Sequence, residues 1–184
     1  MNKYSVVFMP DAQTIALIKE MKLRLSDEIG WFNSKNSLAH FTLFEFLEEA
    51  ANESQFCKQL ERIASEINPF EMTCDAFDSF ENGAFYIKPN TETSLLMANE
   101  MKTVLKESTS IKKTITNTTP HLTIGRRLNN DQLMVAKQMF QEIDISFFVA
   151  HLTLRKFNEQ TRQFDLYQHF PLLGKPKEIQ GSLF

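Results

Sequence analysis

Two short segments of this chain carry nearly the same sequence: His40-Phe41-Thr42-Leu43 and His121-Leu122-Thr123-Ile124. Each is a histidine, any residue, a threonine and an aliphatic residue, inside an apolar run. Side chains of a strand alternate between its two faces, so the histidine and threonine of each segment point the same way. Two such strands facing each other would place two proton-transfer groups and two hydroxyl donors around one small anion. The pair therefore favours cleavage of a phosphodiester without a metal.

The residues around the first segment predict alternating strands and helices. Apolar spacing and capping residues mark the boundaries, with Asn52 and Gln55 resembling a capping box and Pro69 ending the helix that follows them. The expected elements are a strand over Tyr4–Met9, a helix opened by Pro10-Asp11, the motif strand Leu38–Phe46, a helix after Asn52, and a strand over Phe70–Phe80.

The same order recurs around the second segment, after a turn at Glu81-Asn82-Gly83. The polar stretch Ser108–Thr119 leads to the second motif strand, and Asn129 with Gln132 predicts another capped helix. The expected elements are a strand over Ala84–Lys88, a helix opened by Pro89-Asn90, the second motif strand, the helix after Asn129, a long strand over Ser146–Phe157, and a last strand over Gln163–Phe170.

The two halves also match in spacing. Tyr4 lies 36 residues before His40, and Phe85 lies 36 residues before His121. Such self-similarity indicates duplicated units related by pseudo-symmetry, which would bring the two motif strands to one place from opposite sides. We predict one two-lobed domain over residues 1–184, with half-units at 4–80 and 84–157, a C-terminal strand at 163–170 and a short tail at 171–184.

A third segment, His151-Leu152-Thr153-Leu154, also fits the pattern. Aligning Phe80 with Phe157 sets His151 opposite Cys74, on the long strand that follows the second helix of each half. His151 is therefore not the counterpart of His40, and we expect it to be structural or peripheral, although it could line the cleft. His169 lacks a threonine partner, and we expect it to be structural.

Composition restricts the partners. The net charge is −3, which excludes a chain-wide basic surface for long nucleic acid. Residues 1–100 carry 8 basic and 16 acidic side chains, whereas residues 101–184 carry 12 and 7, so a local anion site fits the second half. Cys57 and Cys74 lack metal-type spacing and are expected as free thiols in a reducing compartment. No signal-peptide core or membrane span is recognisable, so we expect a cytoplasmic protein without membrane partners.

The chain resembles the two-histidine (2H) phosphoesterase superfamily, in its bacterial 2′-5′ RNA ligase-like branch. The resemblance rests on both motifs, on the opening run Tyr4–Asp11, and on the closing pair Leu152–Leu154 and Phe164–Leu172. The resemblance implies an α+β fold of two pseudo-symmetric lobes, each an antiparallel sheet with flanking helices, around a central cleft. It implies a cyclic phosphodiesterase with no cofactor and no metal, acting on an RNA 3′ end or a small cyclic nucleotide, with no obligate protein partner. The implied catalytic residues are His40 and His121, and the implied phosphate-binding residues are Thr42 and Thr123.

The resemblance leaves several points open. It favours His121 as the base and His40 as the acid, but pseudo-symmetry allows the reverse. Arg126 and Tyr86 are candidate substrate contacts, although the odd spacing from His121 points Arg126 to the opposite face of a regular strand. The run Phe44-Glu45-Phe46 departs from the small or basic residues that would ease anion binding, which leaves the substrate open.

Three alternative functions remain. A metal enzyme would normally use carboxylates or a third histidine, which the two motifs lack. A non-catalytic module that binds nucleotides or RNA ends would not need two titratable groups. A 2H enzyme acting on another cyclic phosphate or on a 2′-5′ linkage would keep the same four residues.

Overall fold

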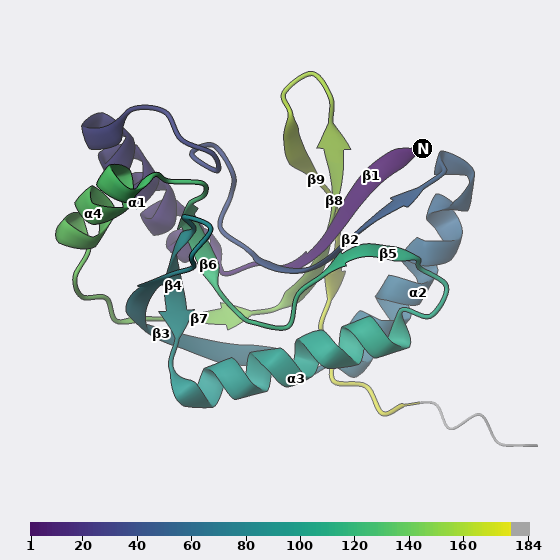
Figure 1. Cartoon of the computed structure of the whole chain (residues 1–184). Coiled ribbons are helices and arrows are strands. Elements are labelled where there is room, and N and C mark those ends of the chain that lie inside the picture. Colours follow the sequence, from purple (N-terminus) through teal and green to yellow (C-terminus); the bar gives the residue numbers. More distant parts are fainter. Residues whose placement is uncertain (178–184) are drawn as a thin grey trace, which may run out of the picture.

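The structure is a computed structural model that describes residues 1–177, in which two antiparallel sheets form two lobes (Figure 1). The strands are β1 (Asn2–Phe8), β2 (Phe41–Glu48), β3 (Phe70–Ser79), β4 (Phe85–Pro89), β5 (Lys113–Thr116), β6 (Leu122–Gly125), β7 (Ile145–Val149), β8 (His151–Asn158) and β9 (Gln163–Pro171). The helices are α1 (Ala12–Ile29), α2 (Glu53–Glu66), α3 (Thr91–Glu107) and α4 (Asn130–Met139), with a 3₁₀ turn at Ala50–Asn52.

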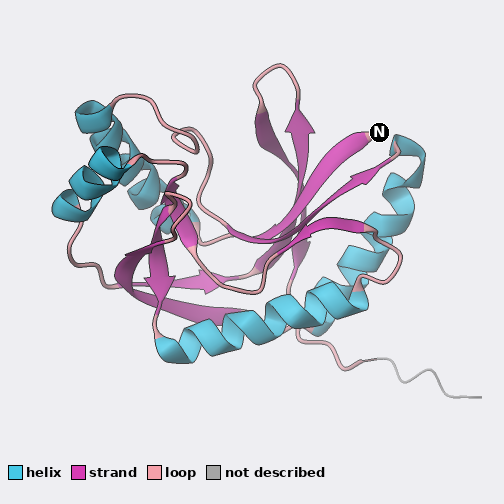
Figure 2. Ribbon diagram, in the orientation of Figure 1, coloured by secondary structure: helices cyan, strands magenta, loops and turns pink. Residues whose placement is uncertain are grey.

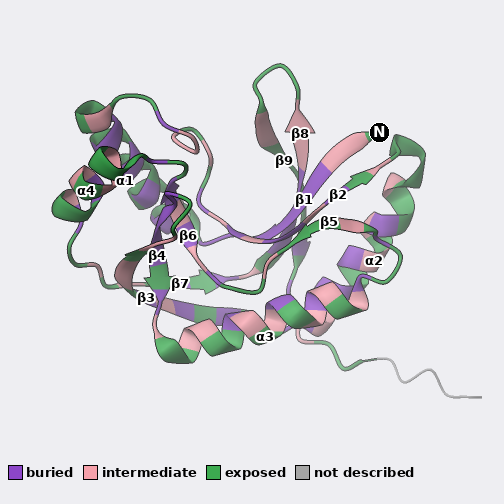
Figure 3. Ribbon diagram, in the orientation of Figure 1, coloured by how far each residue is buried: buried purple, intermediate pink, exposed green. Residues whose placement is uncertain are grey.

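The first sheet has the strand order β5-β2-β1-β8-β9, and the second has the order β6-β4-β3-β7. Helix α2 packs against the first sheet, and α3 runs past both sheets, with contacts to β2 of the first and to β3 and β4 of the second. Helices α1 and α4 lie together beside the second sheet (Figure 2). The predicted α+β class with two antiparallel lobes is therefore confirmed. Most residues of β1 and half of those of β2 and β8 are buried, whereas the edge strands β5 and β9 and the tip of the β8–β9 hairpin are largely exposed (Figure 3).

Capping residues begin three of the four long helices as predicted. Asp11 accepts a hydrogen bond from the Thr14 amide (2.8 Å), Asn90 caps α3 in the same way, and Asn129 forms a capping box with Gln132. The capping box predicted at Asn52 is wrong. Because the preceding turn leaves Asn52 without the extended backbone of an N-cap, its amide instead donates to Glu48 Oε1 (2.8 Å).

The long strand predicted over Ser146–Phe157 is in fact two strands. The chain leaves the second sheet after β7, which pairs with β3, and enters the first sheet as β8, which pairs with β1. The break falls at Ala150, where the alternation of side chains shifts by one residue: Phe147 and Val149 are buried before it, and Leu152 and Leu154 after it. The polar stretch before the second motif, to which no element was assigned from the sequence, contains β5, an edge strand paired with β2.

The two halves exchange strands between the lobes. The second half contributes β8 to the first sheet, and the first half contributes β3 to the second. Val6 pairs with Leu154 and Ile87 pairs with Phe77, which is the register expected when Tyr4 is aligned with Phe85 and Phe80 with Phe157. The internal similarity read from the sequence therefore corresponds to equivalent strand pairs in the two lobes.

The chain beyond β9 runs back along the end of α2. The amide of Gly174 donates to the Ile67 carbonyl, and that of Lys175 to the Ser65 carbonyl. The remainder of the predicted tail, 178–184, lies outside the described residues. Over residues 1–177, none of the helices combines the length and the apolar character needed to cross a bilayer.

Candidate active site

The two motif histidines have the same local environment. His40 immediately precedes β2, and its Nδ1 lies 2.6 Å from the carbonyl oxygen of Leu38. His121 immediately precedes β6, and its Nδ1 lies 2.8 Å from the carbonyl oxygen of Thr119. A carbonyl accepts hydrogen bonds only, so Nδ1 carries a proton in both rings. Each imidazole therefore keeps Nε2 for proton transfer.

The two motif threonines also occupy equivalent positions. Thr42 and Thr123 are the second residues of β2 and β6, and both are partly exposed. Thr42 lies opposite Val7 and Thr123 lies opposite Tyr86, and in both strands a β-bulge follows the threonine. The bulge twists each strand just beyond the hydroxyl, at a position where bulges often re-aim side chains.

Hydrogen bonds join the two motifs into one site. The side-chain amide of Asn117 donates to the carbonyl oxygens of both Thr42 and Thr119 (3.2 Å each). Its Oδ1 accepts from the Thr119 amide (3.0 Å), and the Thr119 carbonyl in turn holds His121. A single side chain thus connects the backbone of the first motif to the imidazole of the second.

The loop that leads to His40 is likewise attached to the second motif strand. Ser34 Oγ donates to the Ile124 carbonyl (3.0 Å), and the Arg126 amide donates to the Asn33 carbonyl (3.1 Å). Lys22, buried on α1, donates to the carbonyls of Ser34 (3.2 Å) and Ser37 (2.7 Å) in the same loop. These contacts fix the approach of the chain to His40.

Both imidazoles favour the neutral form. Burial, followed by the charge of Arg155, holds the pKa of His40 well below 6.5, with smaller contributions from the charges of Lys22 and His121. Burial also lowers the pKa of His121, and the charge of Arg126 acts in the same direction. The charge of His121 therefore reaches His40, although it is the smallest of the influences on that ring.

Arg126 and Tyr86 both lie at the His121 end of the site. The bulge at Ile124 shifts the alternation by one residue, so Arg126 returns to the face of Thr123, which a regular strand would not allow. Tyr86 is 5% exposed, and its ring packs 5.2 Å from that of His121 and 4.4 Å from that of Phe80. Tyr86 therefore supports the His121 ring and leaves little of its own ring surface free.

Arg155, on β8, is a site residue that the sequence analysis missed. It is 4% exposed, its Nη2 donates to Ser5 Oγ (3.0 Å), and its Nη1 lies 3.2 Å from His40 Nδ1. Its Nε has no hydrogen-bond partner within residues 1–177. The available signal was its position two residues after Thr153, which puts both side chains on the same face of the strand.

The third His-x-Thr segment lies in the first sheet, with β1 between it and the first motif. Thr153 and Thr42 both pair with Val7 and therefore share a face of the sheet. However, Thr153 is fully buried, and its hydroxyl is hydrogen-bonded to Nδ1 of His169 (2.9 Å). His151 is exposed, with its ring 5.6 Å from that of His169. The third segment thus lacks the free hydroxyl that the other two offer.

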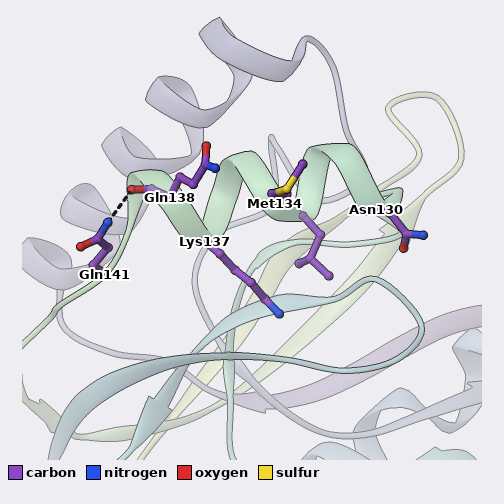
Figure 4. A pocket seen from close by; sticks show the side chains of 6 residues that line it. Asn130, Met134, Lys137, Gln138 and Gln141 are labelled. Carbon is purple, nitrogen blue, oxygen red and sulfur yellow. Dashed lines mark hydrogen bonds between the residues drawn. The ribbon is translucent and has the colours of Figure 1, made fainter.

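Other features of the surface do not coincide with this site. Figure 4 shows a shallow groove along α4, which contains none of the motif residues. A second groove, between α1 and the end of α4, also lies apart from them. In the described part of the chain, no three histidine, cysteine, aspartate or glutamate side chains converge as metal ligands would.

Comparison with known proteins places the chain in a family. Residues 10–161 match the family model of the 2′-5′ RNA ligase superfamily. The chain belongs to that superfamily, and the resemblance to the 2H phosphoesterases is confirmed. No curated protein sequence matches the chain significantly.

Solved structures show the same fold. TT0787 of Thermus thermophilus superposes with a TM-score of 0.63 at 16% identity, over 96% of this chain and 100% of that one. LigT of E. coli, solved with 3′-AMP, superposes with a TM-score of 0.62 at 14% identity, over 93% and 98%. Usb1 of Kluyveromyces marxianus superposes with a TM-score of 0.54 at 13% identity, also over 93% and 98%.

Proposed function

We propose that this protein is a metal-independent phosphodiesterase that opens 2′,3′-cyclic phosphates of RNA ends or nucleotides. The observation that carries the proposal is the pair of equivalent His-x-Thr motifs, in which both imidazoles have Nδ1 bound to a carbonyl and Nε2 available. Binding alone would not require two such groups, whereas hydrolysis of a diester requires one base and one acid.

The chemistry follows from these groups. One neutral imidazole takes a proton from water, and the water oxygen attacks phosphorus. One protonated imidazole gives its proton to the ribose oxygen that leaves. Thr42 and Thr123 donate hydrogen bonds to the non-bridging oxygens, where negative charge increases during the attack. Arg126, returned to the Thr123 face by the bulge, is placed to add positive charge to the same oxygens.

The relatives support a nucleotide substrate. E. coli LigT has been crystallised with 3′-AMP, with NADP+, with ATP and with phosphate. A nucleoside 3′-phosphate presents the same ribose and phosphate groups as a product of cyclic phosphate opening. We therefore propose that the substrate here is an RNA 3′ end or a small cyclic nucleotide.

A substrate screen tests the proposal. The purified protein is assayed in EDTA against 2′,3′-cyclic nucleotides, RNA ending in a cyclic phosphate, ADP-ribose cyclic phosphate and 2′-5′-linked oligonucleotides. We expect hydrolysis of at least one cyclic phosphate, and we expect His40→Ala and His121→Ala each to reduce kcat by about 10²–10⁴-fold. Since both act on one step, the double variant should be little worse than either single variant.

His151→Ala is the matched control, because it removes a histidine from the same sequence pattern outside the proposed site. It should retain a sizeable fraction of the activity. Near wild-type turnover by either motif variant would contradict the proposal. Tight binding of cyclic phosphates without turnover of any of them would instead favour a non-catalytic RNA-end-binding module.

A further inference from the structure

The two motif histidines differ in the charge placed beside them. The guanidinium of Arg155 lies 3.2 Å from His40 Nδ1, but this nitrogen already donates to the Leu38 carbonyl at 2.6 Å. A ring nitrogen that carries a proton cannot accept a hydrogen bond. The contact with Arg155 is therefore the close approach of a positive charge and not a hydrogen bond. Such a contact disfavours a second proton on the His40 ring.

The charge of Arg155 is not neutralised by its surroundings. Within residues 1–177 it forms no ion pair, and the nearest acidic influence, Glu45, is itself paired with Lys3 (2.6 Å). Burial lowers the pKa of Arg155 to about 10, so the guanidinium is still charged at neutral pH. Lys22, from α1, adds a second positive charge near His40.

The pseudo-symmetry places the opposite charge in the other lobe. Arg155 pairs with Ser5 in the first sheet, and the equivalent pair in the second sheet is Asp78 with Tyr86. The position that holds an arginine beside His40 therefore holds an aspartate in the other lobe, next to Tyr86, which packs against the His121 ring. Asp78 is 3.9 Å from Lys88, so this position adds no uncompensated positive charge beside His121. Arg126 is the positive charge that acts on His121, and it is exposed, whereas Arg155 is buried.

We propose that Arg155 is a positioning residue that assigns the two proton-transfer roles: it keeps His40 neutral as the general base and leaves the proton of the pair on His121, the general acid. The assignment of roles rests on the proposed function, and it reverses the order favoured by the resemblance alone. When two titrating groups interact, the shared proton resides on the site with the less unfavourable surroundings.

The proposed step balances. Nε2 of His40 accepts a proton from water as the water oxygen bonds to phosphorus. The bond from phosphorus to the leaving ribose oxygen breaks, and that oxygen takes the proton from Nε2 of His121. Proton exchange with solvent then restores neutral His40 and protonated His121.

Titration of the histidine ring signals by NMR tests the role of Arg155 without any substrate. The His40 and His121 signals are assigned from His40→Gln and His121→Gln. In the wild-type protein His40 should titrate at lower pH than His121. Arg155→Met should raise the pKa of His40 by about one pH unit or more and leave that of His121 nearly unchanged. Arg155→Lys should keep the low pKa of His40, and Arg162→Gln, at the tip of the β8–β9 hairpin, is the control for net charge.

A wild-type titration in which His40 protonates before His121 as the pH falls would overturn the proposal, even if Arg155→Met fails to fold. An unchanged His40 pKa in folded Arg155→Met would overturn it as well.

A change of leaving group tests the assignment of roles. A nucleoside 4-nitrophenyl phosphodiester releases nitrophenolate, which needs no general acid. His121→Ala should then lose less than about tenfold on this ester but about 10²–10⁴-fold on a 2′,3′-cyclic nucleotide, while His40→Ala should lose heavily on both. The reverse pattern would overturn the assignment. No turnover of any diester would overturn the proposed function and the roles with it, whereas the titration would still decide whether Arg155 keeps His40 neutral.

Discussion

At the scale of single residues, the site depends on how each polar atom is already used. The Nδ1 atoms of His40 and His121 are bound to carbonyls, so only Nε2 is left for the proposed proton transfer. The hydroxyls of Thr42 and Thr123 form no side-chain hydrogen bond within the described residues, whereas that of Thr153 is bound to His169. The free hydroxyls therefore distinguish the two proposed motifs from the third.

Removal of these hydroxyls should weaken transition-state binding without changing the titrating groups. We expect Thr42→Val and Thr123→Val each to lower kcat/KM, because each removes a hydrogen bond to a charged oxygen. The loss should correspond to about 1.5–3 kcal/mol of transition-state stabilisation. The pH–rate curve should fall as a whole and keep its two limbs in place.

Thr116→Val, on the edge strand β5, is the matched control and should have wild-type kinetics. A shift in either limb of the pH–rate curve of Thr42→Val or Thr123→Val would show that the threonine acts on a histidine instead of on the substrate.

The four motif residues could be predicted from the sequence, because their spacing is local and it repeats. Arg155 and Lys22 could not, because the burial of a charged side chain depends on residues far away in the chain. Lys22 lies in the buried stripe of α1 with Ile18 and Leu25, and its position in that stripe was the only signal. The prediction that Arg126 points to the face opposite His121 assumed a regular strand, and the strand has a bulge at Ile124.

At the scale of elements, the loop before His40 is held by α1. Lys22 donates to two carbonyls of that loop but has no acidic partner within residues 1–177. Burial, with a smaller contribution from the charge of Arg155, lowers the pKa of Lys22 to about 8. This helix and loop therefore contain a charge whose protonation is linked to folding.

The linkage predicts how stability depends on pH. Between pH 8 and 10.5 the unfolded chain holds more protons at Lys22 than the folded chain, so the contribution of Lys22 to the free energy of unfolding rises with pH. Relative to Lys22→Met, the wild-type protein should gain at most about 3 kcal/mol over this range. Urea unfolding at several pH values measures the difference.

Lys19→Met, on the exposed side of α1, is the control and should follow the wild-type pH dependence. A constant difference between wild type and Lys22→Met from pH 7 to 10.5 would contradict the linkage.

At the scale of the whole molecule, each lobe contains strands from both halves of the chain. The second half of the chain supplies β5 and β8 to the first sheet, and the first half supplies β3 to the second. This exchange places β8, and with it Arg155, beside His40. The repeat in the sequence predicted two equivalent half-units and their alignment. It did not predict that β7 and β8 belong to different sheets, because the two strands are joined by a single residue, Ala150, and the only mark is a shift of the buried positions from Phe147 and Val149 to Leu152 and Leu154.

The central claim is that two histidines, one neutral and one protonated, cleave the diester without a metal. The most direct test is the pH dependence of kcat/KM for a 2′,3′-cyclic nucleotide, measured in EDTA. A bell-shaped curve is predicted, with its maximum below pH 6.5, because burial lowers the pKa of both His40 and His121 from that value. A rate that rises steadily with pH and requires an added divalent ion would indicate a metal-bound hydroxide and would contradict the two-histidine mechanism.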